Sequence, residues 1–193
     1  VNYSRNIGLS LLENFNCDFI TFLDDDGYFV NNNILEYALN DIQENPNTKW
    51  FIFDLVNEKD NLSNNESCGK IDYILDYLYG NKLNGDTHNF LSSEITKNKR
   101  FSTFIKNGQE WTYWIKFSDY ETKHIGRKIQ YHIYQDDGLT KKSQNRNLKL
   151  VLINIYFHIM VFYKRPRCVK ALKKSIQNIL QLPFRLIKII FFK

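Results

Sequence analysis

Three adjacent carboxylates, Asp24, Asp25 and Asp26, follow directly on an apolar stretch of the chain. Residues 19–23 form a short run of aromatic and branched residues, which is typical of a buried strand. In open α/β sheets, ligands bind just beyond the carboxyl ends of strands. Neighbouring carboxylates repel one another unless a cation neutralises them, and Mg²⁺ or Mn²⁺ commonly joins one or two protein carboxylates to substrate phosphates. The stretch therefore predicts a metal-assisted site for a phosphorylated substrate.

A solvated acidic turn at the end of a strand would show the same residues, so from this stretch alone both interpretations stay open. The segment does not fit an EF-hand, because that motif needs acidic residues at alternate positions before its glycine. The positions one, three and five places before Gly27 are Asp26, Asp24 and Phe22, and the last of these is apolar.

The neighbouring segments predict the elements that position these carboxylates. Apolar residues at helical spacing between residues 7 and 15 predict a short helix upstream. The asparagines at 31–33 are suited to cap a helix over residues 34–44, and the apolar run at 50–56 predicts a further strand. The order helix, strand, acidic turn, helix, strand is typical of an α/β domain. The apolar positions of the first helix are Ile7, Leu11, Leu12 and Phe15.

Residues 4–29, SRNIGLSLLENFNCDFITFLDDDGYF, resemble the centre of a family 2 glycosyltransferase of the GT-A fold. In that family an Arg-Asn-x-Gly helix precedes a strand that ends in an Asp-x-Asp motif. The resemblance implies an α/β fold, here a partial GT-A (Rossmann-like) domain, with Mg²⁺ or Mn²⁺ bound by the two outer aspartates of the motif. It also implies that Arg5 and Asn6 shape the donor side of the site. The matching residues are Arg5, Asn6, Gly8, Asp24 and Asp26.

The family transfers a sugar from a nucleotide sugar to a hydroxyl group, with inversion at the anomeric carbon. A cation held by Asp24 and Asp26 would stabilise the charge that develops on the departing nucleotide diphosphate. Asp25 is expected to support donor binding rather than to coordinate the metal. The acceptor hydroxyl must lose its proton to a carboxylate, and general-base catalysis of this kind typically contributes ~10²–10⁴-fold.

A second match, Asn-Gly-Gln-Glu-Trp at residues 107–111, assigns that base to Glu110. Relatives carry Gly-Glu-Asp-Trp or a close variant here, and the second acid is their catalytic base, while Gln109 of this chain replaces the first. Without the family pattern, Glu110 is more simply an acidic residue at the start of a predicted helix over 110–118, where the backbone dipole favours a carboxylate.

A third match lies at residues 135–140, QDDGLT, where many relatives carry His-x-x-Ser-x-Thr and this chain has Gln135 and Gly138 instead. The resemblance covers about residues 1–145 and implies a role in surface polysaccharide synthesis, with a glycan or lipid-linked acceptor. No nucleotide-binding βαβ unit is found before Arg5, so we expect a fragment of the fold with little or no transferase activity by itself. The alternative, kept open by these departures, is a non-catalytic membrane-peripheral interaction module derived from such a domain.

Other residues carry weaker signals. Trp111, Tyr113 and Trp114 could stack on a sugar, although packing in the core explains them as well. The four histidines show no metal-ligand spacing and are interpreted as ordinary residues, and residues 86–88 are a candidate active-site loop. Residues 70–79 predict a helix with one apolar face. Three cysteines without a Cys-x-x-Cys pair fit a reducing compartment better than a disulfide scaffold.

Residues 146–193 are predicted as a separate, basic, amphipathic helical tail, where the positive charge behind the net +5 of the chain is concentrated. Residues 148–163 are too short and too interrupted for a membrane span, which needs ~20 largely apolar residues. Apolar faces beside Lys and Arg suit helices in an anionic membrane interface. We therefore expect a cytoplasmic protein at the inner face of the cell membrane. Packing on the remainder of the fold is an alternative, whereas nucleic-acid binding is disfavoured because no such motif is present.

Overall fold

The computed structural model describes residues 2–25, 27–57, 69–80, 82–83, 85–103, 110–132 and 148–191. The chain forms two compact units, Val1–Asp136 and Asp137–Lys193. The domain boundary predicted between residues 145 and 146 lies outside the described residues.

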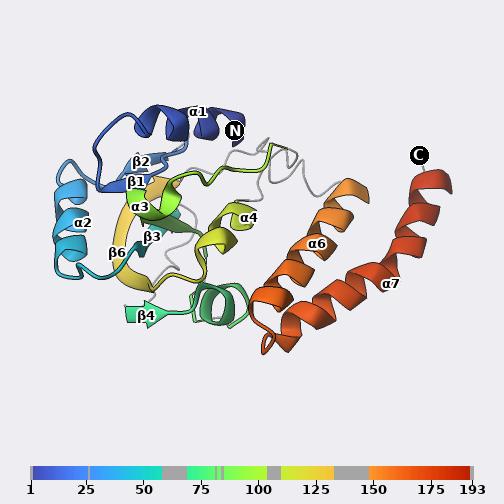
Figure 1. Ribbon diagram of the computed structural model, residues 1–193. Coiled ribbons are helices and arrows are strands. Elements are labelled where there is room, and N and C mark those ends of the chain that lie inside the picture. The colour runs from blue at the N-terminus through green and yellow to red at the C-terminus, as the bar shows by residue number, and fades with distance from the viewer. Residues whose placement is uncertain are drawn as a thin grey trace. The chain divides into compact units, whose positions relative to one another are not determined.

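The first unit is built on a mixed β-sheet (Figure 1). Its strands are β1 (Phe19–Thr21), β2 (Gly27–Phe29), β3 (Trp50–Asn57), β4 (Gly69–Ile71), β5 (Thr87–Ser92) and β6 (Thr122–His132). They lie in the order β1, β5, β3, β6, β2, and β4 also pairs with β6. β3 and β6 run parallel, whereas the other described pairs are antiparallel.

Short helices surround this sheet. They are α1 (Asn2–Leu12), α2 (Ile34–Gln43), the π-helix Tyr73–Leu78, α3 (Ser93–Thr96), α4 (Trp111–Trp114) and the 3₁₀-helix Ile115–Phe117. The mixed α/β architecture predicted from the order of the elements is confirmed, as are the strands after residue 18 and after residue 49 and the helix between them.

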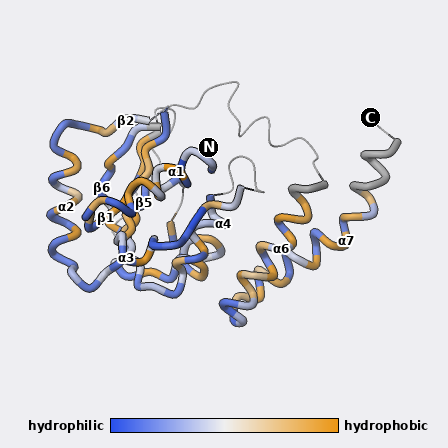
Figure 2. Tube along the Cα trace, turned by 45° about the horizontal axis from the view of Figure 1, so that its top comes forward, coloured by the Kyte–Doolittle hydropathy of each residue, from blue (hydrophilic) through white to orange (hydrophobic). Residues whose placement is uncertain are grey.

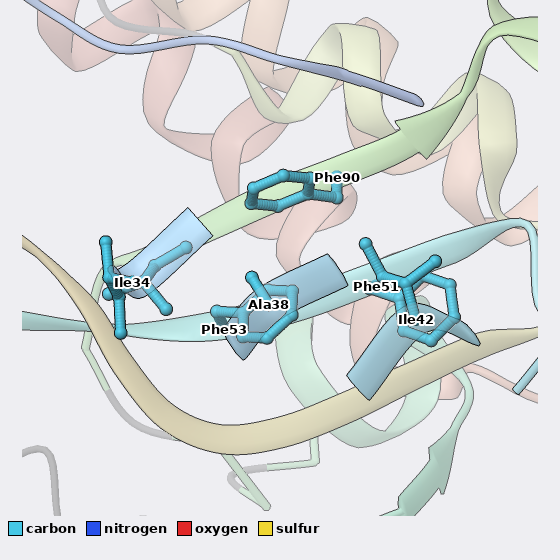
Figure 3. Packing of buried hydrophobic residues seen from close by; sticks show 7 residues of the cluster. Ile34, Ala38, Ile42, Phe51, Phe53 and Phe90 are labelled. Carbon is cyan, nitrogen blue, oxygen red and sulfur yellow. The ribbon is translucent and has the colours of Figure 1, made fainter. Parts of the chain in front are cut away.

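Helix α2 covers one face of the sheet. Ile34, Ala38 and Ile42 recur every four residues, so they lie on the same side of the helix and are buried together. They pack on aromatic residues of the two central strands β3 and β5 and on β6 (Figure 3). Removing this apolar surface from water is the main force that holds the helix on the sheet. The buried cluster consists of Ile34, Ala38, Ile42, Phe51, Phe53, Phe90 and Ile129.

The opposite face of β3, to which alternate residues of the strand point, is covered as well. Trp50 packs against Tyr73 and Trp114, with ring centroids 4.5 and 6.5 Å away. Its indole N–H donates a hydrogen bond to Asn89 Oδ1 over 2.9 Å, so its polar atom is satisfied in the core. A strand buried on both faces explains the unbroken apolar run at residues 50–53.

The helix predicted over residues 70–79 is partly wrong. Gly69–Ile71 form β4, which pairs antiparallel with the start of β6. The helical turn begins at Tyr73, because the Asp72 carboxylate accepts hydrogen bonds from two N–H groups of that turn, both over 2.9 Å. Pairing with a distant strand overrides the local periodicity of the first residues of this segment.

Helix α1 (Asn2–Leu12) overlaps the helix predicted between residues 7 and 15, but it begins earlier, ends before Phe15 and does not bury the predicted apolar face. Ile7, Leu11 and Phe15 are exposed, whereas Asn2 and Leu9 are the buried residues of the helix. The helix therefore docks through a largely polar side. The polar side faces inward because its side chains form hydrogen bonds with other segments of the unit.

The second unit is a pair of helices, α6 (Leu148–Lys164) and α7 (Val169–Phe191), which pack against each other. Pro166 lies in the tight turn between them, where the Cys168 N–H donates to the Arg165 carbonyl over 2.8 Å. Figure 1 shows that α7 bends along its length. Pro183 lies inside this helix and explains the bend, because proline lacks the N–H that would bond one turn back. Among the described helices, none is long and apolar enough to cross a membrane.

Candidate active site

Arg5 joins two carboxylates that lie far apart in the sequence. Its Nη2 donates to Asp24 Oδ1 and its Nη1 donates to Glu110 Oε1, each over 2.5 Å. Arg5 belongs to α1, Asp24 follows β1, and Glu110 directly precedes α4. A guanidinium suits this role because its nitrogens lie in a fixed plane and can bond two partners at once. Three residues predicted for the site are thus brought together in one cluster.

The Arg5 side chain is only 10% exposed. Its guanidinium carbon lies 5.3 Å from the ring centroid of Phe101 and 5.9 Å from that of Phe22, so aromatic rings shield the charge. Burial by itself lowers the pKa of Arg5, but the charges and hydrogen bonds of Glu110 and Asp24 outweigh it and raise the pKa. Arg5 is therefore a permanent positive charge between the two carboxylates.

Two asparagines of α1 hold the segment that leads toward Glu110. Asn6 forms a pair of hydrogen bonds with the backbone of Phe101: its Nδ2 donates to the carbonyl over 2.9 Å, and its Oδ1 accepts from the N–H over 2.7 Å. Asn2 Nδ2 donates to the Ser102 carbonyl over 2.9 Å. Asn6, predicted on the donor side of the site, thus fixes the backbone beside Arg5.

Glu110 stands at the N-terminal end of α4, where its carbonyl accepts hydrogen bonds from the N–H groups of Tyr113 and Trp114 over 2.7 and 3.0 Å. Its side chain makes no capping hydrogen bond to this helix. The carboxylate instead reaches Arg5, and the side chain remains 36% exposed. Its geometry is therefore different from that of a simple helix-capping acid.

The acidic turn after β1 is partly open to solvent. Asp24 remains 42% exposed despite its contact with Arg5, and its carbonyl accepts from the Gly27 N–H over 3.0 Å, which closes the turn. Asp25 is exposed, and Asp26 lies outside the described residues. Within the described part of the chain, no group of three metal-ligating side chains comes together. Asp24 keeps a second carboxylate oxygen, and such donors fit Mg²⁺ or Mn²⁺ where substrate phosphates complete the coordination.

A buried polar network lies behind this turn. Thr21 Oγ1 lies 2.5 Å from His88 Nε2 and also donates to the Asn89 carbonyl over 2.9 Å, while His88 Nδ1 hydrogen-bonds with Gln130 Oε1. Burial lowers the pKa of His88 to about 4, although the hydrogen bond with Gln130 and the charge of Asp24 oppose this shift. The imidazole is therefore neutral at physiological pH and links three strands beneath the turn.

Sequence reasoning missed this network. Residues 86–88, interpreted as a candidate active-site loop, instead lead into β5, to which both Thr87 and His88 belong. Antiparallel pairing of β1 with β5 brings Thr21 opposite Phe90, close to the histidine. A lone histidine in an apolar strand gives no signal of such a network, because its partners come from distant strands.

A side chain at position 27 would displace a member of the same network. A Cβ atom at this position would lie 2.1 Å from the side-chain amide nitrogen of Gln130. β2 and β6 pair here, with Gly27 opposite His132 and Phe29 opposite Gln130. The glycine that follows the three aspartates therefore permits a close approach of the turn to the polar network. At Gly8, in contrast, an added Cβ atom would meet no other atom within 4 Å.

The aromatic residues beside Glu110 are largely part of the core. Tyr113 is fully buried and stacks on Phe101, with ring centroids 3.8 Å apart and an interplanar angle of 15°. Burial raises the pKa of the Tyr113 hydroxyl well above its usual range. Trp114 is also buried and packs on Trp50. Of the three aromatic residues considered for sugar stacking, Trp111 alone is partly exposed.

The positions where the sequence departs from the family pattern, Gln109, Gln135 and Gly138, lie outside the described residues, as does the whole of residues 133–147. The third sequence match therefore stays a prediction.

Comparison with known proteins identifies the fold. No family model matches the sequence, and a search of curated proteins finds no match. Among solved structures, the chain is similar to residues 1–349 of the S. aureus glycosyltransferase TarS, with a TM-score of 0.62 and 11% identity. A TarS structure in complex with UDP-GlcNAc gives a TM-score of 0.62 and 12% identity.

The extent of this likeness differs between the two chains. The match covers 92% of this chain and 50% of the first TarS structure, and 84% of this chain and 47% of the UDP-GlcNAc complex. This chain thus spans about half the length of the structures that it matches. At this level of identity the similarity concerns the fold alone, and it shows that the chain shares the α/β fold of the matched part of TarS.

Proposed function

We propose that this chain carries part of the active site of a glycosyltransferase that moves a sugar from a nucleotide-sugar donor to a hydroxyl group. The observation that carries the proposal is the contact of Arg5 with both Asp24 and Glu110. Through this contact the buried guanidinium of Arg5 holds both Asp24, the carboxylate proposed for the donor side, and Glu110, the carboxylate proposed as the base. The structural likeness to TarS, one structure of which contains UDP-GlcNAc, supports a nucleotide sugar as the donor.

On the donor side, Asp24 and Asp26 are the proposed ligands for Mg²⁺ or Mn²⁺. When bound, the metal would supply Lewis-acid stabilisation of the leaving diphosphate. Arg5 fixes one oxygen of Asp24 and adds a positive charge near the same position. Asp25, which is exposed, is the proposed support for donor binding. A buried guanidinium also provides the planar donor geometry that phosphate oxygens accept.

On the acceptor side, Glu110 is the proposed general base. It would take the proton of the acceptor hydroxyl as that oxygen attacks the anomeric carbon, and attack opposite the leaving diphosphate inverts the configuration there. Arg5 holds one of its two carboxylate oxygens, and the side chain stays partly exposed, as a base that must meet an acceptor requires. The resemblance to family 2 suggests a glycan or lipid-linked acceptor in surface polysaccharide synthesis.

The proposal is tested by transfer assays on the intact protein with a panel of nucleotide sugars, beginning with UDP-GlcNAc. Release of the nucleotide diphosphate and formation of a glycosylated product are measured with and without Mn²⁺. Glu110→Gln keeps an acceptor for Arg5 and should fold, but it removes the base. We expect its kcat to fall by roughly 10²–10⁴-fold.

Glu36→Gln is the matched control, because Glu36 is an exposed glutamate on α2, away from the proposed site. It should retain the wild-type rate. A Glu110→Gln variant that is as active as the wild type would overturn the assignment of the base. Absence of transfer with every donor, together with unchanged fold, would favour the non-catalytic module instead.

Donor binding gives a second test that does not depend on turnover. In titrations of nucleotide sugar with Mn²⁺ present, Asp24→Asn should lose the metal-dependent part of the affinity. Asp18→Asn, which changes an exposed aspartate before β1, should leave the affinity unchanged. Equal affinities of Asp24→Asn and wild type would count against the metal site.

A further inference from the structure

The second unit differs sharply in charge from the first. Of the 26 Lys and Arg residues in the chain, thirteen lie in residues 141–193, and none of the 21 Asp and Glu residues does. Residues 1–140 thus carry thirteen basic and 21 acidic residues. The segment that contains α6 and α7 is therefore a concentrated positive charge on a chain that is otherwise acidic. Such a segment attracts polyanionic surfaces.

Helix α6 exposes an uncharged apolar stripe. Leu152, Tyr156, Ile159 and Tyr163 follow the spacing i, i+4, i+7, i+11, which places them on one side of the helix. All four are exposed, and Tyr163 is 81% exposed. In Figure 2 much of this helix has the colour of hydrophobic residues. Soluble proteins rarely leave such a contiguous apolar stripe in water without a partner.

Helix α7 is divided into three sides. Ala171 and Ser175 are buried, in keeping with the packing of this helix against α6. A second side is apolar and exposed, and a third carries basic and amide residues that are also exposed. The exposed apolar residues are Val169, Leu172, Ile176, Ile179, Leu180 and Phe184. The basic side includes Lys170, Lys173 and Lys174.

We propose that the α6–α7 pair lies in the interface of an anionic lipid membrane. The exposed apolar residues of both helices would enter the boundary of the acyl chains, and the lysines beside them would contact the lipid phosphates. An apolar side next to a lysine-rich side is the arrangement of helices that lie in a membrane surface. This inference is independent of the proposed transferase function, because no residue of the first unit enters it.

Charge decides between the membrane and other occupants. A second copy of the same pair would bring two strongly positive surfaces together, which opposes association. Nucleic acid would satisfy the lysines but would leave the apolar residues in water. An anionic membrane satisfies both, since its headgroups are negative and its interior is apolar. The helices do not need to cross the membrane for this mode of binding.

The test is sedimentation of the purified protein with lipid vesicles. We expect binding to vesicles of phosphatidylcholine with about one third phosphatidylglycerol, much weaker binding to pure phosphatidylcholine, and loss of binding at high salt. The variant K170Q/K173Q/K174Q should bind the anionic vesicles roughly a hundredfold more weakly. The control K70Q/K82Q/K97Q, which changes three exposed lysines of the first unit, should bind like wild type.

A second variant separates apolar insertion from charge attraction alone. L152S/Y156S/Y163S keeps every charge and changes only exposed positions, so circular dichroism should show that the helices are retained. Its binding to anionic vesicles should fall at least tenfold, because the apolar contribution to interfacial binding is lost. Unchanged binding of this variant, or equal binding of wild type to neutral and anionic vesicles, would overturn the proposal. So would a concentration-dependent dimer that the serine variant abolishes, with no vesicle binding.

Discussion

Arg5 and Glu110 are 105 positions apart in the sequence, yet the guanidinium of one lies 2.5 Å from the carboxylate of the other. The same guanidinium holds Asp24 at 2.5 Å. Without it, two partly exposed carboxylates would stand close together with no positive charge between them in the described structure. Arg5 is thus at once a structural tie between α1, the acidic turn and α4 and a candidate part of the reaction centre.

Replacing Arg5 should lower the free energy of unfolding. Arg5→Gln leaves two carboxylates facing each other, and because both are more than one third exposed we expect a loss of about 1–3 kcal/mol rather than the full cost of breaking a buried pair. The measurement is equilibrium unfolding in urea. Arg127→Gln is the control, since Arg127 makes an exposed two-point contact with Asp41, which is worth about 0–1 kcal/mol. Equal losses for both variants would contradict the role of Arg5.

The glycine after the acidic turn should be sensitive to a single methyl group. Gly27→Ala would place Cβ 2.1 Å from Gln130 Nε2, and the displaced side chain would disturb His88; we expect a loss of about 1–3 kcal/mol. Gly8→Ala has no such contact and lies in the interior of α1, where alanine should stabilise the helix by about 0.5–1 kcal/mol. Thermal unfolding of the two variants compares them directly, and opposite signs are expected.

Acidification should weaken the fold through His88. Its folded pKa, lowered by burial to about 4, lies below the value of 6.5 for an unperturbed histidine, so the unfolded chain binds the proton first. The contribution of neutral His88 to the free energy of unfolding is present above pH 6.5. It is lost as the pH falls toward 4, by up to about 3 kcal/mol. Urea unfolding of wild type and His88→Gln across this range isolates the effect. Parallel stability curves for the two proteins would show that His88 does not titrate in this way.

Asn6 should contribute through its backbone partner. Asn6→Ala removes both hydrogen bonds to Phe101 and leaves a buried N–H and carbonyl to find other partners, at an expected cost of about 1–3 kcal/mol. Asn40→Ala, at an exposed position of α2, should be neutral or slightly stabilising because alanine favours a helix. Hydrogen exchange at the Phe101 amide gives a local readout, and protection that persists in Asn6→Ala would argue against this anchoring role.

Much of the first unit is predictable from local patterns. The run at residues 50–56 is typical of a buried strand, and the spacing of Ile34, Ala38 and Ile42 selects the side of α2 that packs on it. Local patterns fail where distant partners compete. Residues 69–71 pair with β6 instead of continuing a helix, and α1 turns its apolar residues outward because its polar side bonds other segments.

The residue types available for chemistry can be read from the chain alone: the carboxylates after β1, the Arg-Asn pair before it, Glu110 at a helix start, and a tail rich in lysine and apolar residues. They follow from composition and short-range spacing. The folded arrangement, in contrast, is what lets Arg5 bond both Asp24 and Glu110, and what brings His88 and Gln130 together beneath the turn. These contacts join residues between 19 and 105 positions apart, and the pairing of strands and the docking of helices bring those residues together.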